Sequence, residues 1–334
     1  MCYQGFVDTL EGLGTKPFDP LRHDVELPLA GTYYAQGFPV EIATNSRDVL
    51  EAAAESWGMY QLEFDRKPVE LRIIVQPQGD LAGEPSFRGQ RGCFSIVSDR
   101  DNFAFYDSRT MLGCCFVSEK TVGDRSWFRY HFLETMVYML LAQHYVVPVH
   151  AACVARDGSG VLLCGWSGAG KSTLAFACAR AGWTFLGDDS TWLLPEEDDG
   201  TAAGRPHLAR FRDDAPRLFP ELEGYVARAR PNGKLSIEVP LSAFPRIRTA
   251  KRCRIASVVL LDRQDGGGAG AKAIPPSEVV ERLIGDMPSY GDEVNARAER
   301  TVRRLLRVPA YRLTYSALDE AVALLSELNH KTEE

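Results

Sequence analysis

The sequence has no apolar segment long enough to cross a membrane. Its longest candidate, Val137–Val149, is interrupted by Gln143 and His144 and is shorter than the ~18 residues that a spanning helix requires. The first residues, Met1-Cys2-Tyr3-Gln4, have neither the basic start nor the apolar core of a signal peptide. We therefore expect a cytoplasmic protein without a membrane segment.

The chain also has no excess of positive charge. It contains 38 Lys and Arg against 45 Asp and Glu, which gives a net charge of −7 and argues against a surface that binds nucleic acid or anionic lipid. Two local basic clusters, residues 251–254 and 297–307, could dock an acidic peptide. They could equally be solvated faces in which the charges pair with nearby acids. We predict no nucleic-acid partner and no membrane partner.

Cysteine pairs at the spacing of a zinc site are absent as well. Of the eight cysteines, Cys114 and Cys115 are adjacent, Cys164 lies in an apolar run, and Cys178 lies on an expected helix face. No CxxC pair is followed by a second pair at zinc spacing. These positions favour reduced, buried thiols.

Length and pattern together predict two domains. Residues 1–145 are expected to form an α+β domain that recognises a substrate or partner. Its predicted elements are an extended segment over 32–42, a helix over 46–59, strands over 70–75, 93–97, 103–106 and 112–117, and a long helix over 127–144. Residues 146–334 are expected to form an α/β domain, with strands over 149–155, 160–164, 183–187, 235–239 and 256–261 and closing helices over 292–307 and 318–329.

A glycine-rich motif in the second domain predicts a nucleotide site. Gly165-Trp166-Ser167-Gly168-Ala169-Gly170-Lys171-Ser172 matches the pattern G-x-x-x-x-G-K-[ST] in full. Glycines let backbone N–H groups point inward at one anion, and the following helix adds its positive end. Lys171 would contact the β- and γ-phosphates, and the Ser172 hydroxyl would hold Mg²⁺. The residues predicted to bind ATP are Gly165, Ser167, Gly168, Ala169, Gly170, Lys171, Ser172 and Thr173.

The surroundings of this motif separate it from a chance glycine turn. The motif follows the apolar run Val161–Cys164 and opens a predicted helix over 171–181. The strand expected over 183–187 would run back towards the loop, because a helix of ten residues travels ~15 Å and a strand of six residues ~20 Å. Open α/β sheets bind ligands at that edge.

Two carboxylates stand at the end of the returning strand. Asp188 and Asp189 would reach the γ-phosphate, and successive strand residues point to opposite sides. One carboxylate could therefore assist the metal while the other accepts a proton from a hydroxyl. A solvated turn at a strand end would explain the same residues. Asp262, which ends the apolar run 257–261, is a competing candidate for the metal-assisting acid.

The order of His150, the loop 165–172 and Gly187-Asp188-Asp189-Ser190 resembles the catalytic domain of HPr kinase/phosphorylase and its relatives, which include kinases of lasso-type peptide precursors. The resemblance implies a P-loop fold similar to that of phosphoenolpyruvate carboxykinase. It implies that Asp188 is the base towards the acceptor hydroxyl, and that Asp189 and His150 lie beside the metal and phosphates. The late Gly-Arg-Asn signature of that family has no counterpart here, so phosphorylase activity is not predicted.

These expectations define an ATP- and Mg²⁺-dependent kinase for a serine or other hydroxyl in a peptide, protein or small molecule. Catalysis would rest on Asp188, Asp189, His150 and Lys171, with Ser172 and Asp189 at the metal. A cation from Arg210, Arg212, Arg217 or, preferably, Lys234 could assist transfer. A nucleotide-dependent binding module and a simple NTPase remain alternatives, and a homo-oligomer is compatible with the sequence.

Overall fold

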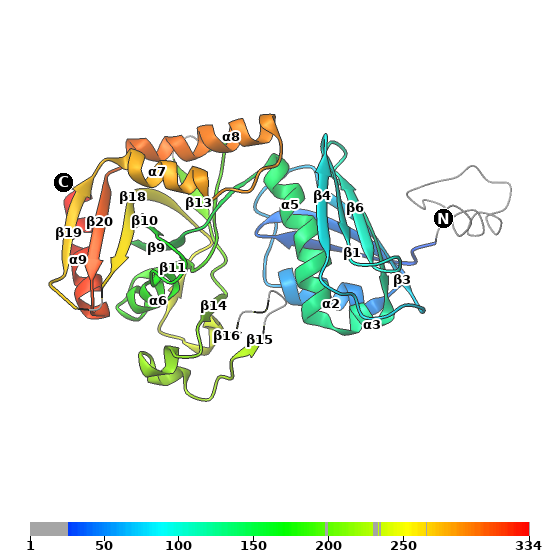
Figure 1. Cartoon of the computed structure of the whole chain (residues 1–334), viewed down its shortest axis with the longest axis horizontal. Helices are drawn as coiled ribbons and strands as arrows, with labels where there is room; N and C mark the ends of the chain where they lie inside the picture. Colours follow the sequence, from blue (N-terminus) through cyan, green and yellow to red (C-terminus); the bar gives the residue numbers. More distant parts are fainter. Residues whose placement is uncertain (1–25, 198–199, 230–232, 234, 265, 334) are drawn as a thin grey trace.

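The computed structural model describes residues 26–197, 200–229, 233, 235–264 and 266–333 (Figure 1). The fold is mixed α/β with several sheets, one of seven strands in the first part of the chain and a larger one of ten strands in the second. A smaller sheet of three strands accompanies the second part. The predicted boundary at 145/146 falls between the last helix before the second part and its first strand, and the division into two domains stays a prediction.

The first sheet has the strand order β1-β2-β3-β7-β6-β5-β4. Two of its neighbouring pairs, β2–β3 and β3–β7, are parallel and the others are antiparallel. The elements are β1 Leu29–Ala35, β2 Phe38–Thr44, α2 Arg47–Trp57, β3 Val69–Gln76, β4 Ser86–Gln90, β5 Cys93–Val97, β6 Phe103–Asp107, β7 Leu112–Ser118, α3 Glu119–Gly123, α4 Arg125–Phe128, η1 Arg129–Leu133 and α5 Glu134–His144.

One prediction for this part was wrong. The single extended segment expected over 32–42 is a hairpin, in which Ala35 pairs with Phe38 across a two-residue turn. Gln36 and Gly37 have φ values of 48° and 93°, as a type I′ turn requires at both positions. Gln-Gly is a weaker hairpin signal than Asn-Gly or Asp-Gly, so the pattern did not reveal the turn.

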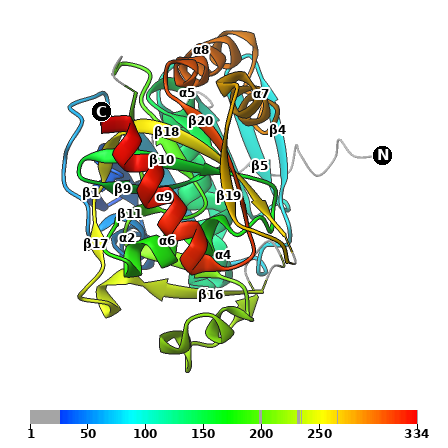
Figure 2. The ribbon, with the colours of Figure 1, turned by 90° about the vertical axis from the view of Figure 1, so that its left-hand side faces the viewer.

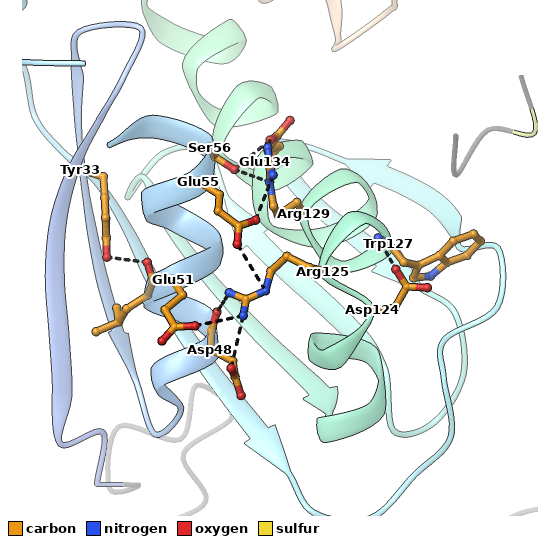
Figure 3. A network of polar contacts seen from close by, with 11 residues as sticks. Tyr33, Asp48, Glu51, Glu55, Ser56, Asp124, Arg125, Trp127, Arg129 and Glu134 are labelled. Atoms are coloured by element: carbon orange, nitrogen blue, oxygen red, sulfur yellow. Dashed lines mark hydrogen bonds and ion pairs between the residues drawn. The ribbon is translucent and has the colours of Figure 1, made fainter. Parts of the chain in front are cut away.

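Polar contacts fasten helix α2 to the long helical segment that follows β7 (Figure 3). Arg125 reaches Asp48 and Glu51, and Arg129 reaches Glu55. These exposed pairs contribute little individually. The predicted helix over 127–144 is observed as α4, a π-helical turn η1 and α5 in succession, so its existence is confirmed and its regularity is not.

A largely buried carboxylate at the start of α5, Glu134, has several polar partners. Glu134 accepts hydrogen bonds from Ser56 and Arg129, and Arg205 from the second part lies 3.6 Å from it. Burial alone would raise the pKa of Glu134, but the charges of Arg205 and Arg129 outweigh it and lower the pKa below its ordinary value. The pairing therefore stabilises the contact between the two parts wherever Glu134 is ionised.

The second sheet runs β17-β11-β9-β10-β18-β13-β12-β8, with β20 beside β18 and β19 beside β20. Its parts, with the small sheet and the helices, are β8 Val147–Val149, β9 Ala152–Arg156, β10 Ser159–Cys164, α6 Lys171–Arg180, β11 Thr184–Gly187, β12 Thr191–Leu193, β13 Thr201–Ala203, β14 Leu208–Phe211, η2 Ala215–Arg217, η3 Pro220–Leu222, β15 Arg228–Ala229, β16 Leu235–Pro240, η4 Leu241–Ala243, β17 Arg248–Thr249, β18 Arg252–Arg263, β19 Gly270–Ile274, α7 Pro276–Gly285, α8 Asp292–Arg303, η5 Arg304–Arg307, β20 Ala310–Tyr315 and α9 Leu318–Glu333.

Helices cover both faces of this sheet, α6 and α9 on one and α7 and α8 on the other (Figures 1 and 2). Strand β10 is apolar at successive positions because both of its faces are covered. Val161 and Leu163 pack towards α6 and α9, whereas Leu162 and Cys164 pack towards α7 and α8. A strand buried on both faces reads as a continuous apolar run rather than an alternating one.

The two parts share a core and several polar contacts. Trp192, Leu194 and Ala203 of the second part pack in the same cluster as the α5 side chains. Arg297 donates to the carbonyl oxygens of Ala142 and Gln143 at the end of α5.

Several side chains of the predicted basic clusters form ion pairs with nearby acids. Lys251 pairs with Glu63, Arg252 with Glu63 and Glu197, and Arg303 with Glu281 and Glu299. These pairs agree with the alternative that the charges are balanced by nearby acids, and the acidic-peptide dock stays a prediction.

None of the helices in the described part of the chain is long and apolar enough to traverse a bilayer. The seven cysteines within the described residues are free thiols. Cys153 of β9 and Cys253 of β18 bring their Sγ atoms to 3.6 Å.

Phe176 of α6 is fully buried, with its ring edge-on to the rings of Phe211, Phe219 and Phe244. Phe176→Ala is expected to lower the free energy of unfolding by ~3–5 kcal/mol, because it removes the ring and leaves a cavity. Phe87→Ala is the control, since Phe87 is 51% exposed, and it should cost less than ~1 kcal/mol. Urea unfolding of both variants measures the difference, and equal losses would contradict this packing.

Candidate functional site

The glycine loop, residues 165–170, connects β10 to α6 in the second sheet. Gly168 and Gly170 have φ values of 92° and 89°, a region that L side chains rarely adopt. Lys171, the first residue of α6, is only 7% exposed, and its Nζ donates to the carbonyl oxygens of Gly165 at 2.9 Å and Trp166 at 3.3 Å. Burial lowers the pKa of Lys171, and the charge of Asp189 opposes that effect. The ammonium therefore lies inside the curl of the loop, close to an acid.

Strand β11 ends at the same edge of the sheet as the glycine loop. It is antiparallel to β9, and β9 is antiparallel to β10, so β10 and β11 point the same way. The predicted return of the strand is confirmed, but β9 separates the two strands, unlike in a simple βαβ unit. The Ser172 hydroxyl at the start of α6 donates to the Asp188 main-chain oxygen at 3.3 Å. The loop and the acid pair are therefore in contact.

The two carboxylates of the pair have different surroundings. Asp188 is 5% exposed, and its Oδ2 accepts the main-chain N–H of Arg210 at 2.6 Å. Burial raises the pKa of Asp188 to about 6, although the charge of Arg210 and this hydrogen bond oppose the rise. The Asp189 side chain is half exposed, and its Oδ1 lies 3.5 Å from His150 Nδ1. The pair thus consists of one buried carboxylate with a raised pKa and one carboxylate open to solvent.

His150 lies between two strands rather than within one. The strand expected over 149–155 is divided into β8 and β9, and His150 occupies the break. Val149 of β8 pairs with Thr191 of β12 in antiparallel register. The residues next to them, His150 and Ser190, therefore lie opposite each other. This pairing brings His150 to Asp189.

Among the predicted cations, Arg212 lies against the loop. A Cβ added to Gly168 would lie 3.1 Å from Arg212 Nη2. The Arg210 side chain instead pairs with Glu238, and Lys234 lies outside the described residues. Sequence reasoning missed Arg282 of α7, whose guanidinium lies over the exposed Trp166 ring, 3.5 Å from its centroid. Only the position of α7 reveals this contact, and that helix was not predicted.

Two cavities adjoin these residues. One, of about 590 Å³, is lined by Gly170, Thr173, Arg217, Arg263 and Tyr315 among others. The second, of about 380 Å³, is lined by His150, Asp189, Ser190, Arg205 and residues of α5 among others. They share no lining residue. Both volumes are in the range of small-molecule sites.

The residues predicted to hold Mg²⁺ fit that ion in its usual form. Ser172 offers a hydroxyl, Asp189 offers a half-exposed carboxylate, and Mg²⁺ commonly combines one or two protein ligands with substrate phosphates and water. Within the described residues no group of three or more His, Cys, Asp or Glu side chains could hold a metal ion.

Asp262, the competing acid, lies near the end of β18. Cys164 of β10 pairs with Leu260 of β18 in parallel, so Asp262 lies two residues further along, level with the glycine loop. It pairs with Thr314 of β20 through the main chain. Asp262 and the Asp188–Asp189 pair thus all lie at the sheet edge that carries the glycine loop. The pair is distinguished by its contacts, since the Asp188 main-chain oxygen accepts from Ser172 and the Asp189 carboxylate lies beside His150.

The comparisons with known proteins are limited in extent. A profile of the family described as "SynChlorMet cassette protein ScmC" matches residues 114–211, which is less than a third of the chain and includes His150, the glycine loop and the acid pair. The solved structure titled "Structure of the Hpr(Ser) kinase/phosphatase from Coxiella burnetii" is 13% identical, with a TM-score of 0.31, over 56% of this chain and 99% of that one. At this TM-score the likeness supports no conclusion about activity. No curated protein matches the sequence.

Gly170→Ala tests the close contact between the loop and β20. A Cβ at Gly170 would meet the Tyr315 hydroxyl at 2.5 Å, and this hydroxyl donates to the Ala169 carbonyl at 3.0 Å. Gly182→Ala is the matched control, because Gly182 has a φ of 92° and no atom within 4 Å of an added Cβ. Both variants carry the strain of a positive φ, ~1 kcal/mol. Gly170→Ala should destabilise further in denaturant unfolding.

Combining Gly170→Ala with Tyr315→Phe should recover part of the extra loss, since it removes the hydroxyl that the methyl group meets. Equal destabilisation by Gly170→Ala and Gly182→Ala would contradict the contact.

Proposed function

We propose that the protein is an ATP-dependent phosphotransferase that moves the γ-phosphoryl group to a hydroxyl. The observation that carries this proposal is the contact between the start of α6 and the end of β11, where the Ser172 hydroxyl binds the Asp188 carbonyl. A loop of the phosphate-binding sequence pattern and the strand end that carries the two carboxylates therefore lie side by side. Phosphoryl transfer needs both, since it depends on holding charge and orienting the nucleophile.

The glycine loop and the cations around it would hold the triphosphate. Lys171 would leave the carbonyl oxygens of Gly165 and Trp166 and bind the β- and γ-phosphates, and Arg212 would add charge beside Gly168. The cavity beside Gly170 and Thr173 has room for the nucleoside. Mg²⁺, held by Ser172, Asp189 and phosphate oxygens, would neutralise charge on the transferring group.

Asp188 would act as the base. The acceptor oxygen forms a bond to the γ-phosphorus, the bond from that phosphorus to the β–γ bridging oxygen breaks, and ADP leaves with that oxygen. The acceptor proton passes to the Asp188 carboxylate. A raised pKa of about 6 suits this task, because a base is most effective when its pKa approaches the working pH. His150 would orient Asp189 through their 3.5 Å contact.

A nucleotide-dependent binding module or a simple NTPase would use the same loop. A simple NTPase would have no use for a second cavity beside His150 and Asp189. ATP turnover that releases phosphate with every hydroxyl acceptor absent, and is unchanged when acceptors are added, would favour the NTPase.

Asp188→Asn is expected to lower phosphoryl transfer by ~10²–10⁴-fold, the usual contribution of a positioned base, while ATP affinity stays near that of the wild type. Lys171→Ala should lose both ATP binding and transfer. The wild type should gain about tenfold in transfer per pH unit until the pH passes about 6, and Asp188→Asn should lack this slope. Isothermal titration and labelled-ATP transfer measure these quantities. Equal loss of ATP affinity in both variants would contradict the base assignment.

The same substitution should stabilise the fold at neutral pH. The folded-state pKa of Asp188, about 6, exceeds its ordinary value of 3.8, so the folded state binds the proton more tightly and loses stability as the pH rises from about 4 through about 6. Asp188→Asn removes this penalty, which is about 3 kcal/mol at most. The gain should be present at about pH 8 and vanish near pH 4 in urea unfolding. A destabilised variant at the higher pH would contradict the unfavourable burial of the charge.

A further inference from the structure

The cavity beside His150 and Asp189 lies at the seam between the two parts of the chain. Residues of α5 in the first part, Tyr138 and Met139, form one wall, and Trp192 and Tyr290 of the second part form the other. Arg205 and Asp286 add one charge of each sign. Its lining is therefore mainly aromatic and apolar, with the candidate catalytic residues at one end.

This cavity continues into another along the first sheet. A cavity of about 520 Å³ follows the β4–β5 hairpin, and it shares Met139, Pro288 and Tyr290 with the cavity beside His150. The three shared residues place the two cavities side by side along the seam, and together they make one candidate groove. We call it the seam groove, from His150 and Asp189 at one end to residues 87–92 at the other.

Strand β4 borders the far end of the seam groove. It is the last strand of the seven-stranded sheet, and within the described part of the chain it pairs only with β5. All five of its residues are exposed. An unpaired strand edge offers a row of N–H and C=O groups to which an extended peptide can add as a further strand.

The charges of the groove differ between its ends. At the β4 end, Arg88 and Arg91 are the charged residues of the cavity lining, and the described residues give neither an ion pair. Arg109 lies nearby, since its Nη2 donates to the Arg91 carbonyl oxygen at 3.1 Å. At the catalytic end the charged residues of the lining are Asp189, Asp286 and Arg205. The groove thus favours negative charge only at a distance from the reacting hydroxyl.

We propose that the acceptor is an extended peptide segment bound in the seam groove. Its hydroxyl residue lies at the end of β11, where Asp188 precedes Asp189 beside His150. An apolar or aromatic residue packs between Tyr138 and Tyr290, and acidic residues lie at Arg88 and Arg91. The elongated shape, the open strand edge and two arginines that have no ion pair among the described residues favour a peptide over a small molecule, which the 380 Å³ cavity alone could hold. This inference rests on the proposed phosphotransferase function.

The test uses the full chain with Mg²⁺, ATP and two mixtures of short serine peptides that share the same apolar positions. One mixture carries Asp and Glu at the positions outside the serine and its apolar neighbour, and the other carries Lys there. The wild type should phosphorylate the acidic mixture with a kcat/KM about tenfold higher, as two exposed charge contacts allow. Arg88→Glu with Arg91→Glu should reverse this preference, and the pair of Gln substitutions should abolish it.

Arg100→Glu is the control, because Arg100 is an exposed arginine of the first part that does not line the groove. It should keep the wild-type preference. ATP affinity should be unchanged in all these variants, which separates a folding defect from lost peptide binding. Equal use of both mixtures by the wild type, or an unchanged preference in the double Glu variant, would overturn the groove and leave the phosphotransferase proposal intact.

If neither mixture is phosphorylated, fluorescence anisotropy with the labelled mixtures decides between the two proposals. Preferential binding of the acidic mixture that the double Glu variant loses would uphold the groove and count against phosphoryl transfer. No binding of either mixture would overturn the groove.

Discussion

The parallel direction of β10 and β11 is the constraint on which the candidate site depends. Strand β9 lies between them and is antiparallel to both, so the chain enters the glycine loop and leaves β11 at one edge of the sheet. The Ser172–Asp188 contact follows from this alignment. If β11 ran the other way, the acids would lie at the opposite edge of the sheet and the glycine loop would have no carboxylate pair beside it.

A chain of buried charges joins that edge to the first part of the molecule. Arg205 lies near Glu134 of α5, and its guanidinium lies over the Tyr138 ring. Arg205 and Asp188 also interact electrostatically through the low-dielectric interior. Breaking a buried pair of this kind leaves an uncompensated charge. The first part is therefore bound to the site electrostatically and also forms a wall of the cavity where an acceptor would lie.

The sequence predicted what depends on local pattern. The glycine motif, the apolar run of β10 and the helix after it are sufficient to place Lys171 and Ser172, and chain lengths alone bring Asp188 to the loop edge. The insertion of β9, the break at His150 and the neighbours Arg205, Arg282 and Tyr315 depend on pairings between distant strands and helices. Periodicity within a segment contains no information about those partners. The different burial of Asp188 and Asp189 is equally a property of the folded chain.

A crystal structure with Mg²⁺ and a non-hydrolysable ATP analogue tests the central claim most directly. The account predicts that the triphosphate curls through the glycine loop, that Lys171 turns from the Gly165 and Trp166 carbonyls to the terminal phosphates, and that the γ-phosphate faces Asp188 and Asp189 at the end of β11. A triphosphate bound in the loop with its terminal phosphate directed away from β11 would contradict it.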